Sequence, residues 1–176
     1  MLKIFSILFS LMINIIAQAQ VQWSTVGIDG LTCSQCFYSV EQSIRSLSNV
    51  KDVAMNLNGS EAKVKQSIKS YNEILKIGEQ VNKAGFSVRF LTITVKIDTS
   101  FNISTSKITN HIGSLLLLNN TMLNSDSLYT FQIIDSRFCK KNVYKQWGSS
   151  IKSHQLKNGK DPNNIFVIEV TVSKSH

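Results

Sequence analysis

The sequence predicts an α+β protein built in two parts. Several short stretches alternate apolar and polar residues, which is typical of strands with one buried face. Other stretches repeat apolar residues every three or four positions, which is typical of helices. In the first half of the chain these patterns follow the order strand, helix, strand, strand, helix, strand. In the second half they predict a small, β-rich α+β unit whose order matches no motif that we can name.

The first two elements lie within residues 23–47. Residues 23–28 alternate, with Val26 and Ile28 on one face, and this predicts a strand. The helix that follows ends near Ser48. It carries an apolar stripe at helical spacing, formed by Phe37, Val40, Ile44 and Leu47. The segment between the two elements is therefore a strand-to-helix junction.

A hairpin is predicted next. Residues 53–57 alternate, and residues 62–64 continue the alternation on the other side of Asn58-Gly59. Both residues of this pair accept positive φ angles, so Asn-Gly is a strong hairpin signal.

A second helix and a fourth strand complete the first part. The helix carries the apolar positions Ile74, Leu75, Ile77, Val81 and Ala84. Gly85 follows where a glycine cap is common, and residues 86–97 read as a strand. The order is the split βαβ, or ferredoxin-like, motif, in which two helices cover one face of a four-stranded antiparallel sheet. We place this domain at residues 20–90.

The strand-to-helix junction carries two thiols three residues apart, in Gly30-Leu31-Thr32-Cys33-Ser34-Gln35-Cys36. A helix N-terminus offers unpaired N–H groups and a partial positive charge, and both favour thiolate. Ser34 is the expected N-cap. The spacing lets both sulfurs converge at the helix tip, which suits a metal clip, a redox pair or half of a zinc knuckle.

Residues 23–90 resemble a heavy-metal-associated domain, the module of copper chaperones, of the N-terminal arms of metal-pumping ATPases and of the periplasmic mercury-binding protein. The family motif is Gly-Met-Thr-Cys-x-x-Cys after the first strand, and it corresponds here to residues 30–36. The element order of the whole segment agrees with that family.

The resemblance implies that Cys33 and Cys36 are the metal ligands, with Thr32 beside them in the loop. Leu31 stands where the family usually has methionine, which packs beneath the loop, and leucine fills a similar volume. Phe86, after the second helix, corresponds to the family position that faces and shields the metal loop.

Two thiolates form a soft site of low coordination number. Soft ligands favour Cu(I), which we rank first, and they also accept Hg(II) or Ag(I). Zn(II) is possible but prefers four ligands. An open site lets the thiols of another protein add and remove the ion, so the expected partner donates or accepts metal, as a membrane transporter does.

Residues 1–19 predict a cleaved secretory signal. They contain an early lysine, an apolar run and a small-residue ending at Ala17-Gln18-Ala19. The alternative is a membrane anchor, but the run is short and interrupted by Ser10 and Asn14. No later stretch is long enough to span a bilayer. We therefore expect a periplasmic or secreted protein that is not inserted in the membrane after cleavage.

Export raises the question of oxidation. A Cys33–Cys36 disulfide would close a small loop and would block metal binding. Such a pair at a helix N-terminus also fits a thiol–disulfide oxidoreductase. Against that alternative, thioredoxin-like folds place a cis-proline beside the disulfide, and the only proline here is Pro162. Two buried, unreactive cysteines are a third possibility.

The chain is basic, with a formal net charge of +8. The excess lies mainly in residues 91–176, which carry ten basic and five acidic side chains. No cluster combines arginines with aromatic residues, so no nucleic-acid partner is expected. A solvated basic face is the simplest interpretation, and contact with a membrane surface or an acidic partner is the alternative.

Residues 91–176 form the second part, a β-rich domain of unknown type that begins without a linker. Residues 113–135 predict a β-hairpin, although a helix over 105–118 fits the period too. A helix stripe follows at Val143, Trp147 and Ile151. A loop over 152–164 and a strand over 165–172 close the chain.

Few residues of this second part point to chemistry. Cys139 could donate a third ligand to the metal, but a half-buried thiol or a dimer-forming thiol is the simpler interpretation. The chain shows no nucleophile–base spacing and no phosphate-binding glycine loop, so we do not expect an enzyme. The sequence predicts an exported protein that holds one soft metal ion, for transfer or for sequestration.

Overall fold

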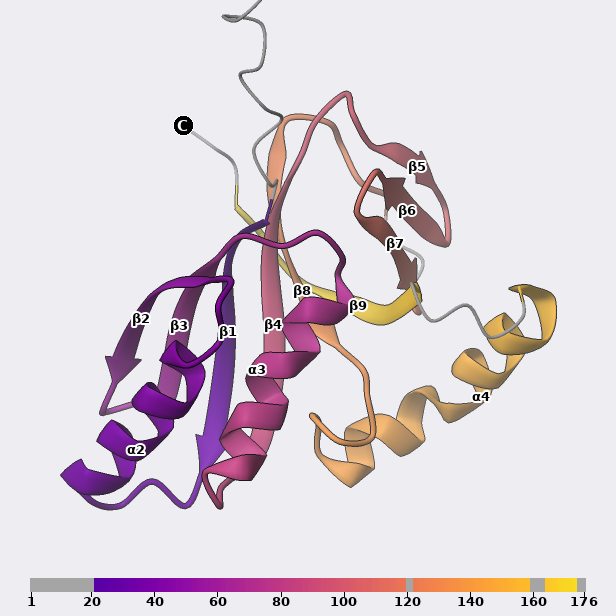
Figure 1. Ribbon diagram of the computed structural model, residues 1–176. Coiled ribbons are helices and arrows are strands. Elements are labelled where there is room, and N and C mark those ends of the chain that lie inside the picture. The colour runs from indigo at the N-terminus through magenta and orange to yellow at the C-terminus, as the bar shows by residue number, and fades with distance from the viewer. Residues whose placement is uncertain (1–20, 120–121, 159–163, 174–176) are drawn as a thin grey trace, which may run out of the picture.

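A computed structural model of the chain describes residues 21–119, 122–158 and 164–173 (Figure 1). The signal sequence predicted at residues 1–19 lies outside these ranges and stays a prediction. Gly159 and Pro162, which the sequence places in a loop, also lie outside them.

The first part has the predicted order of elements. The strand-helix-strand-strand-helix-strand series consists of β1 (Val21–Asp29), α2 (Ser34–Arg45), β2 (Val50–Asn56), β3 (Glu61–Gln66), α3 (Asn72–Lys83) and β4 (Ser87–Ile97). These four strands pair antiparallel in the order β2-β3-β1-β4. This is the ferredoxin-like arrangement, and its strand and helix patterns were readable from the sequence.

The turn between β2 and β3 is longer than the two-residue Asn-Gly turn that the sequence predicts. Asn56 pairs with Glu61, so four residues connect β2 to β3 instead of the Asn-Gly pair alone. The positive φ falls on Ser60, at 48°. The hairpin position is therefore confirmed, and its two central residues are not the ones that adopt the left-handed conformation.

The second part adds strands to the same sheet. Its elements are β5 (Asn102–Ser104), β6 (Lys107–Asn110), β7 (Gly113–Leu117), β8 (Ser127–Ile133), α4 (Lys141–Asn158) and β9 (Asn164–Ser173). The described residues form one nine-stranded sheet in the order β2-β3-β1-β4-β8-β9-β7-β6-β5. β4 pairs with β1 on one side and with β8 on the other. The boundary expected at residue 90 thus falls inside β4, and no linker separates the parts.

The hairpin predicted at residues 113–135 is wrong. β7 and β8 do not pair, because β9 lies between them, parallel to β7 and antiparallel to β8. The rival helix over 105–118 is wrong too, since these residues form β6 and β7. Residues 115–118 are all buried, as expected for a strand that is covered on both faces. Such a strand lacks the alternation of apolar and polar residues that identifies a half-buried strand in the sequence.

Helix α4 is longer than expected. The helix stripe at Val143, Trp147 and Ile151 is confirmed, but the helix continues to Asn158 through residues that the polar composition had placed in a loop. Polar residues on the exposed side of a surface helix do not end it.

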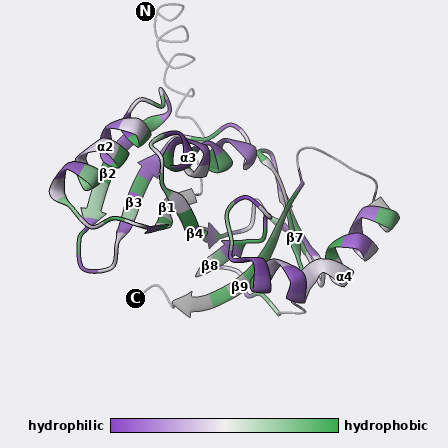
Figure 2. Cartoon of the chain, turned by 90° about the horizontal axis from the view of Figure 1, so that it is seen from below, coloured by the Kyte–Doolittle hydropathy of each residue, from purple (hydrophilic) through white to green (hydrophobic). Residues whose placement is uncertain are grey.

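Helices cover opposite faces of the sheet in the two parts (Figure 2). α2 and α3 pack on the face that carries the large core cluster, which includes Ile165 and Val167 of β9. Phe166 and Ile168, which alternate with these residues, pack instead with α4 around a second cluster of Leu118, Ile134, Cys139 and Ile151. Successive strand residues point to opposite faces, so α4 lies on the side of the sheet away from α2 and α3.

Candidate metal centre

The loop between β1 and α2 begins with a left-handed turn. Gly30 has a φ of +90°, a backbone conformation that residues other than glycine rarely adopt. Leu31 then points into the core and is 8% exposed, as the sequence predicted for the residue beneath the loop. Thr32 and Cys33 return to the surface. The loop is thus anchored from below by one apolar side chain while its thiol side faces solvent.

Arg89 fixes the end of β1 next to this loop. Its guanidinium lies 3.4 Å from the Asp29 carboxylate and donates a 2.8 Å hydrogen bond to the Gly59 carbonyl. It also lies 3.8 Å from Glu61. No local sequence pattern points to Arg89, because its three partners come from distant positions in the chain.

Cys33 is the N-cap of α2. Its backbone is extended, with φ −134° and ψ 152°, and its sulfur accepts a 3.1 Å hydrogen bond from the backbone N–H of Cys36. This corrects the expectation that Ser34 is the cap. The helix begins at Ser34, and the Cys33 sulfur takes the role that a hydroxyl oxygen usually plays. Negative charge on sulfur at this position is stabilised by the helix dipole.

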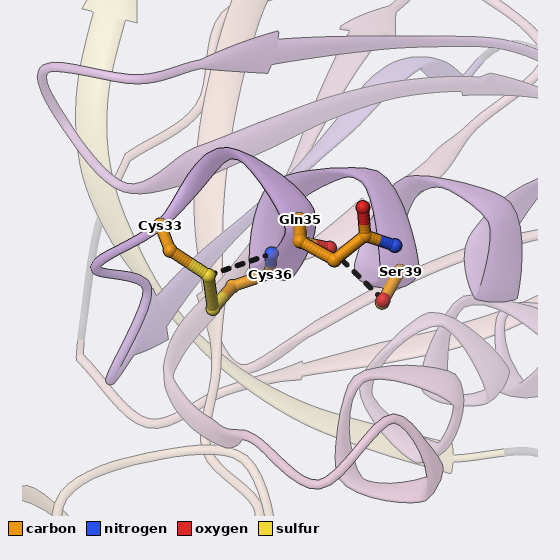
Figure 3. The surroundings of a disulfide bond; sticks show 4 residues. All are labelled: Cys33, Gln35, Cys36 and Ser39. Carbon is orange, nitrogen blue, oxygen red and sulfur yellow. Dashed lines mark hydrogen bonds between the residues drawn. A yellow bond between two sulfur atoms is a disulfide. The ribbon is translucent and has the colours of Figure 1, made fainter.

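The two sulfurs meet at the tip of the helix and are bonded as a disulfide (Figure 3). The Cα atoms of Cys33 and Cys36 lie 5.2 Å apart. Cys33 is exposed, whereas Cys36 is partly buried against the core. One turn further, the Ser39 hydroxyl donates a 2.9 Å hydrogen bond to the Gln35 carbonyl. The two sulfurs converge as the spacing predicts, and they form the disulfide that blocks metal binding until it is reduced.

Phe86 reaches the loop from the end of α3. Gly85, with a φ of +90°, reverses the chain there, as the sequence predicted. The N–H of Gly85 donates to the Asn82 carbonyl and the N–H of Phe86 to the Val81 carbonyl, at 3.0 and 3.2 Å. This is the Schellman arrangement. A Cβ at Gly30 would lie 3.7 Å from the Phe86 ring, so the ring lies beside the loop, as expected for the shielding position.

Cys139 does not join this site. It is 7% exposed, belongs to the cluster under α4, and its thiol donates to the Asp135 carbonyl at 3.1 Å. Burial raises the pKa of the Cys139 thiol, the reverse of what a metal ligand needs. The hypothesis of a third ligand is therefore corrected: α4 and its cluster lie on the opposite face of the sheet from α2.

No larger cluster of candidate metal ligands surrounds the two sulfurs in the described part of the chain. Within residues 21–119, 122–158 and 164–173, no three His, Cys, Asp or Glu side chains lie close enough together to hold a metal ion. A closed structural zinc site would need four ligands. The described residues thus offer two sulfurs at an open surface and nothing more.

The sequence of residues 25–87 matches the model of the heavy-metal-associated domain. The chain contains a heavy-metal-associated domain. This domain runs from β1 to the start of β4 and includes Cys33, Cys36 and Phe86. It covers less than half of the chain, so α4 and the strands β5 to β9 lie outside it.

Several solved structures are similar to a part of this chain. The N-terminal domain of PacS from Synechocystis PCC6803 is 22% identical, with 39% of this chain and 94% of that chain covered and a TM-score of 0.34. The yeast copper transporter domain CCC2A, solved in apo and Cu(I)-loaded states, is 23% identical, with 37% of this chain and 88% of that chain covered and a TM-score of 0.33. A copper binding domain from HMA7, a P-type ATPase, is 27% identical, with 39% of this chain and 90% of that chain covered and a TM-score of 0.34. No curated protein matches the chain.

Among the described residues, none of the helices has the length and apolar character needed to cross a membrane.

Proposed function

We propose that the protein is an exported, non-enzymatic carrier of one soft metal ion, which it holds through the reduced thiols of Cys33 and Cys36. One observation carries the proposal: the two sulfurs converge at the exposed N-terminal tip of α2, with no third candidate ligand among the described residues. The heavy-metal-associated domain supports the same class of function.

Cu(I) is the ion that this donor set favours. Thiolates are soft ligands, and a monovalent soft ion is satisfied by two of them. Hg(II) and Ag(I) share this preference and rank next. Zn(II) would have to recruit further ligands from water or from another protein, because it favours four.

The disulfide sets a condition on metal binding. Two electrons and two protons from a thiol reductant convert the Cys33–Cys36 bond into two thiols, with the reductant oxidised to its own disulfide. Metal then replaces the thiol protons, so affinity rises with pH until both sulfurs are ionised. The N–H of Cys36, already directed at the Cys33 sulfur, favours the ionised form.

Anaerobic titration of the reduced protein with Cu(I), against a competing chelator, tests the proposal. We expect one tightly held ion per chain, and no such binding in the Cys33→Ser/Cys36→Ser variant. The matched control is Cys139→Ser, which also removes a thiol but leaves the loop intact and should bind as the parent does. Parallel titrations with Hg(II), Ag(I) and Zn(II) give the metal preference. Failure of the reduced parent to bind any soft ion would reject the proposal.

The proposed export has a direct test. A chain collected from the periplasm or the medium should begin at Gln20, which mass spectrometry of the intact protein measures.

The proposed partner is a protein that donates or accepts the metal, such as a membrane transporter. An open two-thiol site lets incoming thiols displace those already bound. Transfer and sequestration differ in this step: a carrier exchanges its ion with a competing dithiol rapidly, whereas a storage protein does not.

Thiol–disulfide exchange is a second candidate, favoured by the disulfide itself between an exposed and a partly buried cysteine. The strand order β2-β3-β1-β4 with two helices on one face differs from the arrangement of thioredoxin-like enzymes. Reduction of a model disulfide by the metal-free dithiol, at rates well above those of free thiols, would favour this candidate over metal transport.

A further inference from the structure

Helix α4 combines a buried apolar side with an exposed basic side. Val143, Trp147 and Ile151 pack toward the sheet, and the His154 ring lies edge-on to Phe166 of β9 at a centroid distance of 6.3 Å. Because this side of the helix is occupied by the sheet, the opposite side is directed away from the protein.

Three lysines follow that outward side. Lys141, Lys145 and Lys152 are exposed, and at 3.6 residues per turn they lie within about 40° of one another around the helix axis. Leu156 falls in the same sector and is 88% exposed. We call these four residues the α4 stripe. Lys141 and Lys145 are one helical turn apart, and Lys145 and Lys152 are two turns apart. The stripe ends in a large apolar side chain that is exposed to water.

Among the residues that the structure describes, no acidic side chain neutralises the α4 stripe. Residues 136–160 contain no aspartate or glutamate. The ion pairs found in the described residues all use Arg45, Arg89 or Arg137, so the stripe lysines have no carboxylate partner there. Arg137, by contrast, is bound to Asp135 and Glu79 at 2.9 and 3.1 Å. The positive charge of this face is thus available for an external anion.

We propose that the α4 stripe docks the protein on an anionic lipid bilayer. A row of lysines along one side of a helix complements a plane of negative headgroups without needing a shaped pocket. Each lysine at such a surface strengthens binding about fivefold. The exposed Leu156 enters the interfacial region, where an apolar side chain is favoured. An acidic protein would leave that leucine without a role unless it also offered an apolar pocket.

The topology places this surface usefully for a metal carrier. β8 pairs antiparallel with β4, and β4 pairs antiparallel with β1, so β8 and β1 run in the same direction. The metal loop after β1 and the chain that enters α4 after β8 therefore leave the sheet at the same end. The docking itself does not depend on metal binding, and the two can be tested separately.

The test is vesicle flotation with the chain from Gln20, which retains every described element and lacks the apolar residues 1–19. We expect binding to vesicles of phosphatidylcholine mixed with phosphatidylglycerol, little binding to phosphatidylcholine alone, and release by high salt. Lys141→Gln/Lys145→Gln/Lys152→Gln should weaken binding about 100-fold, three lysines at about fivefold each. The control Lys51→Gln/Lys65→Gln/Lys76→Gln removes the same charge from exposed positions on β2, β3 and α3 and should bind nearly as the parent does.

Three results would overturn the docking proposal. The parent could fail to bind anionic vesicles; the two triple variants could weaken binding equally, which would indicate net charge alone; or the stripe lysines could be needed for binding polyglutamate but not vesicles, which would indicate an acidic protein partner. Circular dichroism of each variant checks the fold. Leu156→Ser adds a further readout, because it should weaken vesicle binding and leave polyglutamate binding unchanged.

Discussion

The two faces of the sheet hold their helices differently. α2 and α3 pack on a continuous cluster that takes residues from nearly every strand, including Val26, Val64 and Ile93. Among the described residues, α4 packs on a cluster with four buried members, Leu118, Ile134, Cys139 and Ile151. Since burial of apolar surface is the main stabilising term, α2 and α3 are held more firmly than α4. The α4 side should open first when the protein is destabilised.

A shared core nevertheless joins the two parts. Phe138, in the segment between β8 and α4, is fully buried in the large cluster beside α3. Its ring lies so close to Gly78 that a methyl group there would overlap it. Arg137 and Glu79 form an ion pair across the same contact. The chain that leads into α4 is thus tied to the heavy-metal-associated domain, even though α4 itself packs on the other face.

Phe138→Ala should have the largest effect, because it empties this junction. We expect a loss of about 3–5 kcal/mol in the free energy of unfolding, with a single transition in urea for both parts. Tyr38→Ala is the control: Tyr38 is an aromatic residue of α2 that is 57% exposed, and its loss should cost little. Two separate transitions in the parent would contradict the idea of one shared core.

Leu31 tests how the metal loop is anchored. Leu31→Ala removes the side chain beneath the loop and should cost about 2–4 kcal/mol. Leu31→Met nearly preserves the volume of the side chain and should cost less than about 1.5 kcal/mol. Urea unfolding measures both, and Cu(I) titration of the reduced methionine variant should match the parent. Equal losses for the two variants would mean that the site is not tightly packed.

The metal loop was largely predictable because its determinants are local. The spacing of Cys33 and Cys36, the left-handed Gly85 and the alternation of β1 all lie within a few residues of what they control. The cap was misassigned from Cys33 to Ser34, an error of one position that is typical of helix ends. Arg89 could not be found, because its contacts to Asp29 and Glu61 depend on strand pairing.

The strand order beyond β4 was not predictable, because it also depends on pairing between residues that are distant in the sequence. β7 and β8 are neighbours in sequence, which favours a hairpin, but β9 enters between them after the whole of α4. Its parallel pairing with β7 depends on contacts such as Leu115 opposite Ile165, which no local pattern encodes. The elements β8, α4 and β9 were recognisable from their periods, whereas their arrangement was not.

Gly85 and Gly148 allow a comparison of backbone effects in the two parts. A Cβ at either position would meet no atom within 4 Å, so packing plays no part. Gly85 has a φ of +90°, and Gly85→Ala should destabilise by about 1–2 kcal/mol because L-residues are strained there. Gly148 lies inside α4, where Gly148→Ala should instead stabilise by up to about 1 kcal/mol through helix propensity. Urea unfolding and helical circular dichroism should give opposite signs.

The smallest effect comes from Cys139 in the cluster under α4. Burial raises the pKa of its thiol, so the folded state holds the proton more tightly than the unfolded state does. The resulting stability is complete below the ordinary thiol pKa of about 8.5 and is lost as the pH rises toward the raised value. The free energy of unfolding should therefore fall more steeply between about pH 8 and about pH 10 in the parent than in Cys139→Ala.

Tyr71, whose pKa burial also raises, is present in both proteins and cancels in this difference. The Cys33–Cys36 disulfide is kept intact during the measurement, so that no other thiol titrates. Parallel curves for parent and variant would mean that the α4 cluster already admits water to Cys139 in the folded state. That result would identify α4 as an element that opens readily, and it would place the difference between the two faces of the sheet in their dynamics as well as in their packing.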